Sequence, residues 1–413
     1  MRTSRLIAIG FLALCGLVVG LVAAGLVNPS APVAVFPTAQ PRPTEPPDPS
    51  KAITLEFVYS TEKREWMDGA PQLPPSAGFA GRDQLQGAID QWLATNPTVD
   101  GRPITVKRTA LGSQEIVAGL QNGSLKPAAI SPASTMQLAQ INQLTVDGTT
   151  NLAADAQPLV LTPLVLFAFK DTPAAKLAGN PQFWQELQRL VVEPARAQRL
   201  KFAQTSPDTS NSGLQTMLLM AYAFRGKADN LAAADIASTE FRTWWAQYAK
   251  NVEKFGRSTG PIVTEVLQFG PSRYSAVALY ENLAVENLRT ALGRNYDPVI
   301  IYPPQNIYSD HPFAVLDAPW VSAEQREAAE QLRAFLLQEP AQRNAVLLGF
   351  RPANDAVKLD IPGSPFAAPA NLERGLQPQL SAPLVAAPPA EVVTAMLDFW
   401  TKEVRPDPDV TKE

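Results

Sequence analysis

The chain has 413 residues, of which 46% are hydrophobic and 18% charged, so it is long enough for two domains and too apolar for a disordered protein. Its formal net charge of −4 supplies no broad basic surface for binding nucleic-acid phosphates. One cysteine, Cys15, and one histidine, His311, exclude disulfide frameworks, Cys-x-x-Cys redox pairs and multi-histidine metal sites. We therefore expect neither a metal nor a cofactor.

The N-terminus has the features of an export segment. An uncharged apolar run extends from Leu6 to Val27 and follows Arg2 and Arg5. A membrane helix needs about 20 such residues, and its positively charged end stays in the cytoplasm. The run is longer than the core of an ordinary signal peptide, which favours a signal anchor over residues 1–27 and a folded body outside the cytoplasm.

Two other fates of the apolar run stay open. Val22, Ala23 and Ala24 form a candidate cleavage site, so the alternative to a membrane anchor is a secreted protein. Lipidation at Cys15 would require a small residue where Leu14 stands. Residues 28–50 are rich in proline and predict an extended linker before the folded body.

Beyond the linker, β-rich segments alternate with amphipathic segments of helical period, which indicates an α/β protein with parallel sheets covered on both faces. Strands are expected at 53–59, 104–109, 127–130, 201–204, 277–280, 299–302 and 312–316. Helices are expected at 85–93, 113–122 with Ser113 as N-cap, 183–192, 214–224, 239–255, 261–269, 285–292, 322–337 and 391–402.

Two extended passages are interpreted as crossings between two lobes. The run 159–170 is interrupted by Pro163 and is too long for one compact strand. A second extended passage lies between Tyr302 and His311. The resulting division assigns residues 51–162 and 312–413 to lobe 1 and residues 163–311 to lobe 2.

Polar residues follow predicted strands or open predicted helices in both halves of the chain. They are Ser60 and Thr61; Ser131, Ser134 and Thr135; Ser210, Asn211, Ser212 and Gly213; and Tyr280 and Glu281. Open α/β sheets bind ligands at the carboxyl ends of strands, so these residues are the candidate ligand site. The alternative for each is an ordinary helix cap.

Two of these residues carry additional information. Gly213 permits close approach of the backbone to a neighbour at the start of a helix. Glu281 repels an anion unless it is protonated or paired, and Arg273 is a candidate partner for a salt bridge.

A cell-surface hydrolase is the alternative from another class, because Asp310 and His311 accompany many serines. The chain contains no Gly-x-Ser-x-Gly motif, and adjacent residues on an extended chain point in different directions. We therefore expect no catalytic residues and a structural role for His311.

Several motifs together resemble a known family. They are Tyr59-Ser60-Thr61, Ser131-Pro-Ala-Ser-Thr135, Thr205-Ser-Pro-Asp-Thr-Ser-Asn-Ser-Gly213, Tyr280-Glu281-Asn282, Ser309-Asp-His-Pro-Phe-Ala-Val-Leu316 and Leu347-Leu-Gly-Phe350. The chain resembles the bacterial extracellular solute-binding proteins over residues 51–354, and within them the molybdate/sulfate-type branch often found beside von Willebrand factor A domains.

The resemblance implies a two-lobed type II periplasmic-binding-protein fold with two crossover strands. It implies capture of a small polar solute or oxyanion between the lobes, without catalysis, by Ser60, Ser134, Ser212 and Tyr280. The implied partner is an ABC transporter permease or a von Willebrand A-domain protein. A sensor or scaffold that acts without a transporter is the remaining alternative.

Overall fold

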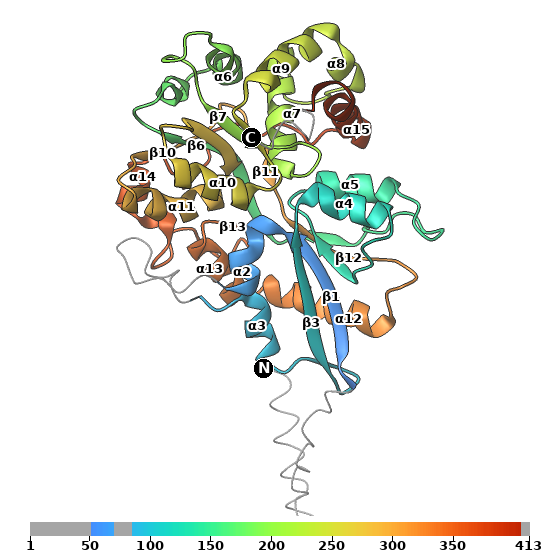
Figure 1. Cartoon of the computed structure of the whole chain (residues 1–413). Helices are drawn as coiled ribbons and strands as arrows, with labels where there is room; N and C mark the ends of the chain where they lie inside the picture. Colours follow the sequence, from blue (N-terminus) through green and yellow to red (C-terminus); the bar gives the residue numbers. More distant parts are fainter. Residues whose placement is uncertain (1–50, 70–84, 406–413) are drawn as a thin grey trace, which may run out of the picture. The chain divides into compact units, whose positions relative to one another are not determined.

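Two separate β-sheets, each covered by helices on both faces, organise the chain (Figure 1). The structure is a computed structural model that describes residues 51–69 and 85–405. Within these ranges, no helix combines the length and apolar character needed to cross a membrane. The predicted anchor at 1–27 and linker at 28–50 lie outside the described residues.

The first sheet has the strand order β2-β3-β1-β4-β12-β5. These strands are β1 (Ile53–Ser60), β2 (Thr98–Val99), β3 (Arg102–Leu111), β4 (Ala129–Ser131), β5 (Ala156–Pro158) and β12 (Pro312–Val315). β1 is parallel to both β3 and β4, whereas β12 is antiparallel to β4 and β5.

Alternation along β1 builds a core on each face of the first sheet, because successive strand side chains point to opposite faces. Leu55 and Phe57 pack with α3 (Ala88–Leu93) and α12 (Ala323–Leu336). Val58 packs on the other face with α4 (Ser113–Gln121) and α5 (Thr135–Gln143). We call this sheet and its helices the first lobe.

The second sheet has the order β10-β6-β9-β7-β8. Its strands are β6 (Val160–Phe169), β7 (Phe202–Thr205), β8 (Lys254–Gly256), β9 (Ala276–Tyr280) and β10 (Pro298–Ile301). On one face, Leu164 and Leu166 pack with α6 (Phe183–Val192), α7 (Asn211–Arg225) and α9 (Thr239–Asn251). On the other, Val165 and Phe167 pack with α10 (Thr259–Phe269) and α11 (Glu281–Gly293). This is the second lobe.

The segment containing Pro163 differs from the prediction, since β6 is one continuous strand of 10 residues. Its length is supported because different partners pair with its two ends. β11 (Tyr308–Ser309) and β13 (Arg351–Pro352) pair with its first half, and β9 and β10 with its second.

The chain passes between the sheets three times. It leaves the first sheet after Pro158 and enters the second at Val160. It returns between Ser309, which pairs with β6, and Pro312, which pairs with β5. The third passage, absent from the sequence prediction, follows Phe350 and leads directly into β13.

The C-terminal segment packs on the second lobe, which differs from the predicted assignment of residues 312–413 to lobe 1. Phe366 and Leu376 join the core around α10 and α11. Phe399, at the end of α15 (Ala390–Phe399), packs against Trp245 of α9. These apolar residues cover the helices of the second sheet, whereas β12 and α12 pack in the first lobe.

Short elements complete the described chain. They are η2 (Thr61–Lys63), α2 (Arg64–Asp68), η3 (Pro173–Leu177), α8 (Ala233–Ala237), α13 (Glu339–Leu347), η4 (Pro365–Ala367), α14 (Pro369–Leu372) and η5 (Trp400–Val404).

Some helix ends differ from the predicted positions. The N-cap of α4 is Gly112, because the Ser113 hydroxyl instead accepts a hydrogen bond from the backbone N–H of Ala133. The helix expected from Leu214 begins three residues earlier, at Asn211. The helix expected to reach Phe255 ends at Asn251, and the following residues form β8.

Candidate functional site

Polar residues at strand ends of both sheets are buried. Each is the last residue of its strand: Ser60, Ser131, Thr205, Tyr280 and Ser309. Helix N-termini follow three of these strands closely or directly, at Thr61, Asn211 and Glu281. The sequence predicted candidate polar residues at or after the ends of four of these strands, β1, β4, β7 and β9, but not at Ser309.

Asn211 connects the two lobes. Its side-chain nitrogen donates to Tyr280 Oη at 3.0 Å and to Ser309 Oγ at 3.1 Å, while its oxygen accepts from Gln137 Nε2 of α5 at 3.0 Å. Burial, with a smaller effect from the charge of Glu62, raises the pKa of Tyr280 well above its usual value, so its hydroxyl stays protonated. We call Asn211, these hydrogen-bond partners and the residues around Lys63 and Ser212 described next the buried polar cluster.

A group of hydroxyls lies beside Asn211 in the second lobe. Ser212 Oγ is 2.7 Å from Thr205 Oγ1 and 2.9 Å from Thr259 Oγ1, and Ser210 Oγ is 3.3 Å from the same threonine. Gly213 is required for this packing, because a Cβ there would lie 2.2 Å from the Thr205 carbonyl oxygen. The predicted residues Ser210, Ser212 and Gly213 therefore lie together, and Thr259, which was not predicted, lies with them.

In the first lobe, the buried polar cluster is centred on Lys63, a residue that was not predicted from the sequence. Its Nζ donates to Ser60 Oγ and, at 3.3 Å, to the Pro132 carbonyl oxygen, and it lies 3.0 Å from His311 Nδ1. The turn η2 places Lys63 three residues after Ser60, so the Ser-Thr-Glu-Lys spacing after a strand was the available signal.

The ionisable side chains of Lys63, Glu62 and His311 lie close together. Burial lowers the pKa of Lys63 to about 7, against the opposing charges of Glu62 and Asp310. Burial and then the charge of Lys63 lower the pKa of His311 well below its usual value, so the imidazole is neutral. Glu62 Oε1 lies 3.7 Å from His311 Nδ1. His311 also has a φ of 42°, an uncommon backbone conformation for a residue other than glycine.

The remaining predicted residues of the first lobe make structural contacts. Ser131 Oγ donates to the His311 carbonyl oxygen at 3.5 Å. Ser134 caps α5 by accepting from the Met136 N–H at 3.2 Å. Thr135 has an exposed side chain, and Thr61 Oγ1 lies 2.6 Å from Ser258 Oγ of the second lobe.

Glu281 points away from the cluster. Its carboxylate accepts from Arg351 at 2.7 Å and 2.8 Å and from the Tyr302 hydroxyl. Burial alone would lower the pKa of Arg351, but the Glu281 carboxylate raises it, so the guanidinium stays charged. The considered partner Arg273 instead lies over the rings of its own neighbours, and the suggested Glu281–Arg273 pair is wrong.

Asp310 and His311 do not form a catalytic pair. Asp310 Oδ1 accepts from the backbone N–H of Thr135 at 2.9 Å, while His311 Nδ1 faces Lys63. Among the described residues, no group of three or more His, Cys, Asp or Glu side chains is placed to hold a metal ion.

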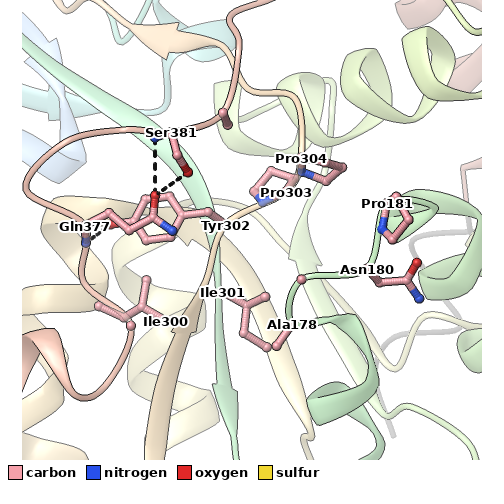
Figure 2. Close-up of a pocket in the computed structure, with 13 residues that line it drawn as sticks. Ala178, Asn180, Pro181, Ile300, Ile301, Tyr302, Pro303, Pro304, Gln377 and Ser381 are labelled. Atoms are coloured by element: carbon pink, nitrogen blue, oxygen red, sulfur yellow. Dashed lines mark hydrogen bonds between the residues drawn. The ribbon is translucent and has the colours of Figure 1, made fainter.

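Two cavities open at the surface of the described body. One of about 340 Å³ adjoins the cluster between η2, α2, α10 and α11, and its lining includes Thr61, Glu62 and Pro261. The other, of about 410 Å³, lies in the second lobe (Figure 2). Figure 2 shows Gln377 beside Tyr302 and hydrogen-bonded to Ser381, with Pro303 and Pro304 between Tyr302 and Pro181 in this view.

Comparisons with known proteins identify relatives by sequence and by fold. Residues 84–351, more than half of the chain, match the family model described as bacterial extracellular solute-binding protein. Among curated proteins, none matches the sequence.

Solved structures share the fold at low identity. A periplasmic thiamin binding protein has a TM-score of 0.55 and 15% identity, over 87% of this chain and 99% of that one. An ABC-transporter substrate binding protein from Agrobacterium tumefaciens has a TM-score of 0.52 and 14% identity, over 86% of this chain and 95% of that one. A ferric binding protein from Campylobacter jejuni has a TM-score of 0.51 and 10% identity, over 84% of this chain and 96% of that one. The described body therefore has the two-lobed fold of periplasmic binding proteins.

Proposed function

Because the chain belongs to the bacterial extracellular solute-binding proteins, we propose that it captures a small polar solute between its two lobes, at the buried cluster around Asn211 and Lys63. The observation that carries the proposal is the meeting of polar side chains from both sheets in that cluster. Ser60, Asn211 and Tyr280 are the predicted residues best placed to contact the solute. The solute is bound and released without chemical conversion.

The mechanism is closure of the lobes around the solute. Thr61 and Ser258, and Gln137 and Asn211, form hydrogen bonds between side chains of opposite lobes. A solute that contacts both lobes binds the closed arrangement more tightly than the open one, so it shifts the population toward closure. The three passages near Leu159, Asp310 and Phe350 are the places where the backbone would bend.

Delivery to an ABC transporter permease is the role that fits the family. The apolar run from Leu6 to Val27 would tether the body outside the membrane, and a von Willebrand A-domain protein is the alternative partner. Protease added to intact cells should digest residues 51–413, whereas full protection of the body would contradict an extracytoplasmic location.

The solute-binding proposal is tested by thermal unfolding of the full-length chain in detergent. The panel contains sulfate, molybdate, monosaccharides, the standard amino acids and divalent metal salts. A solute at about 100 times its dissociation constant should add about 2.7 kcal/mol to the free energy of unfolding, which raises the melting temperature measurably. No shift with any member would contradict the proposal.

A variant pair ties the binding to the cluster. Asn211→Ala should weaken binding of the panel solute that shifts the melting temperature by about 5- to 150-fold, since a buried polar contact is worth about 1–3 kcal/mol. Asn122→Ala, on the exposed end of α4, is the matched control and should leave the affinity unchanged. Equal affinities of the two variants would place the solute elsewhere.

A further inference from the structure

The backbones of the two lobes approach each other closely beside the buried polar cluster. Gly112, which precedes α4 in the first lobe, faces the carbonyl oxygen of Thr209 in the loop before α7 of the second lobe. A Cβ at Gly112 would lie 2.4 Å from that oxygen, whereas ordinary van der Waals contact begins at about 3.4 Å. The backbone of Gly112 has φ −65° and ψ 145°, which any residue can adopt. Glycine is therefore needed here for the approach of the lobes and not for the local conformation.

An ion pair bridges the lobes at the same place. The Glu115 carboxylate, in the first turn of α4, accepts hydrogen bonds from the Gly112 N–H at 2.8 Å and from the Arg257 guanidinium of the second lobe. The Thr209 hydroxyl donates to the Arg257 carbonyl oxygen at 2.8 Å, so the two second-lobe loops at this contact are joined to each other. One carboxylate thus holds the start of α4 and the opposite lobe together.

The second-lobe side of this contact continues into the buried polar cluster. Thr209 lies two residues before Asn211. Arg257 directly precedes Ser258, whose hydroxyl contacts Thr61 of the first lobe. The contact at Gly112 is therefore placed to set how closely the second-lobe part of the cluster approaches the first lobe.

We propose that Gly112, Glu115, Thr209 and Arg257 form a latch that holds the lobes closed and so positions the residues of the cluster. The latch joins groups of the chain to one another, so it stabilises the closed arrangement whether or not a solute is bound. A closed arrangement that is already populated lowers the free-energy cost of binding. The Arg257 side chain is 80% exposed, so its attraction is weak and screened by salt, whereas the backbone contact is steric and independent of salt.

The separation of the lobes is measured on the full-length chain in detergent, without solute, by electron–electron double resonance between two nitroxide labels. The labels are attached at Gln121→Cys on α4 and Gln268→Cys on α10, two exposed positions, after the one natural cysteine is removed by Cys15→Ser. With the natural latch, the short distance of the closed arrangement should dominate. Gly112→Leu should shift most molecules to longer distances, because the added side chain cannot fit against the opposite backbone.

Two controls separate the latch from other effects of the substitution. Gly293→Leu, at the exposed end of α11, has no neighbouring group within 4 Å of an added Cβ and should leave the distances unchanged. Ser322→Ala removes the N-cap of α12 in the first lobe, and it should lower the melting temperature without changing the distances.

The ion pair is tested separately through the exposed Arg257 side chain. Arg257→Gln should lower the ratio of closed to open molecules by about 1.5- to 5-fold, and Arg257→Glu should lower it further by repulsion from Glu115. Raising the NaCl concentration from about 0.05 M to about 0.5 M should remove most of these differences. The same change should leave the effect of Gly112→Leu in place.

The outcomes are independent of the solute panel, because no solute is present. Distances in Gly112→Leu equal to those of the natural latch would overturn the proposal. If Gly112→Leu does not fold, unchanged distances in Arg257→Glu at low salt would overturn it instead. A panel that gives no shift in melting temperature would overturn the proposed function and leave the latch intact.

Discussion

Two groups of buried polar side chains lie next to each other in the sequence, since one contains Tyr280 and the other contains Glu281. They differ in how completely their side chains are hydrogen-bonded. On one side, Tyr280 joins the cluster between the lobes, where three buried side-chain atoms have no hydrogen-bond partner in the described part of the chain. On the other, Glu281 is fully buried and accepts from both Arg351 and Tyr302, so its carboxylate is satisfied. A satisfied buried network stabilises one conformation, whereas an incomplete one leaves buried polar groups unpaired at a cost in stability.

The satisfied group also fixes the C-terminal segment to the second lobe. Arg351 donates to the carbonyl oxygens of Gln377 and Pro378, and the backbone N–H of Gln377 donates to the Tyr302 hydroxyl. Since Arg351 follows the third passage between the sheets, this network holds both the passage and the segment after it. The comparison leads to four predictions, ordered by the size of the expected effect.

The largest effect is expected from breaking the satisfied group. Arg351→Met should lower the free energy of unfolding by about 3–5 kcal/mol, because it leaves the buried Glu281 carboxylate without its cation. Chemical denaturation measures the loss, and Arg343→Met, which removes an exposed pair with Glu339, is the control. A loss below about 1 kcal/mol would show that the network does not stabilise the fold.

The second effect is a pH dependence from Lys63, whose surroundings include Glu62, Asp310 and His311. Its pKa is about 7 in the fold against an ordinary 10.5, so the unfolded chain binds more protons between these values. Stability should therefore rise with pH from 7 toward 10, by at most about 1.4 kcal/mol per pH unit from this group.

Comparison with Lys63→Met isolates that contribution. The variant should lose the part of the slope that Lys63 provides, measured by denaturation between pH 7 and 9. Identical slopes in both proteins would contradict a buried Lys63 whose pKa is lowered to about 7.

The sequence predicted the positions of strand ends because these depend on local patterns. Alternation in β1 and the turn residues after it located Ser60, and the resemblance in the same motifs gave the two-lobed fold. Pairings between distant residues were not accessible in this way. Glu281 and Arg351 are 70 residues apart, and they meet where β9 and β13 both pair with β6.

The missed site residues have a related explanation. Lys63 and Glu62 are charged residues beside a strand end, and such residues are exposed in most proteins. Their burial depends on the approach of His311 from the return passage, 248 residues later than Lys63. Likewise, the apolar residues of α15 predicted a helix correctly, but not which of the two lobes it would cover.

A third prediction concerns Ser134, a predicted ligand residue whose hydroxyl caps α5. Ser134→Ala should cost about 1 kcal/mol of stability, the usual value of an N-cap, and leave solute affinity unchanged. Ser322→Ala, which removes the cap of α12, is the matched control and should show the same loss. A fall in affinity for Ser134→Ala alone would return this residue to the binding site.

The smallest effect has the opposite sign and contrasts most directly with Arg351→Met. Glu62→Gln should raise the free energy of unfolding of the solute-free protein by about 0.5–1 kcal/mol, since it removes a buried charge whose Oε1 has no hydrogen-bond partner and supplies an amide donor close to His311 Nδ1. The same variant should bind the solute less tightly, because it removes a charge from the proposed site. Such a trade is common, since sites built for binding are often less stable than their neutral replacements. Denaturation without solute and calorimetric titration with it measure the two quantities on one preparation. Replacing a residue that has a purely structural role lowers the free energy of unfolding of the protein. A lower value in Glu62→Gln would therefore place Glu62 with the satisfied group and remove the distinction between the two buried polar groups.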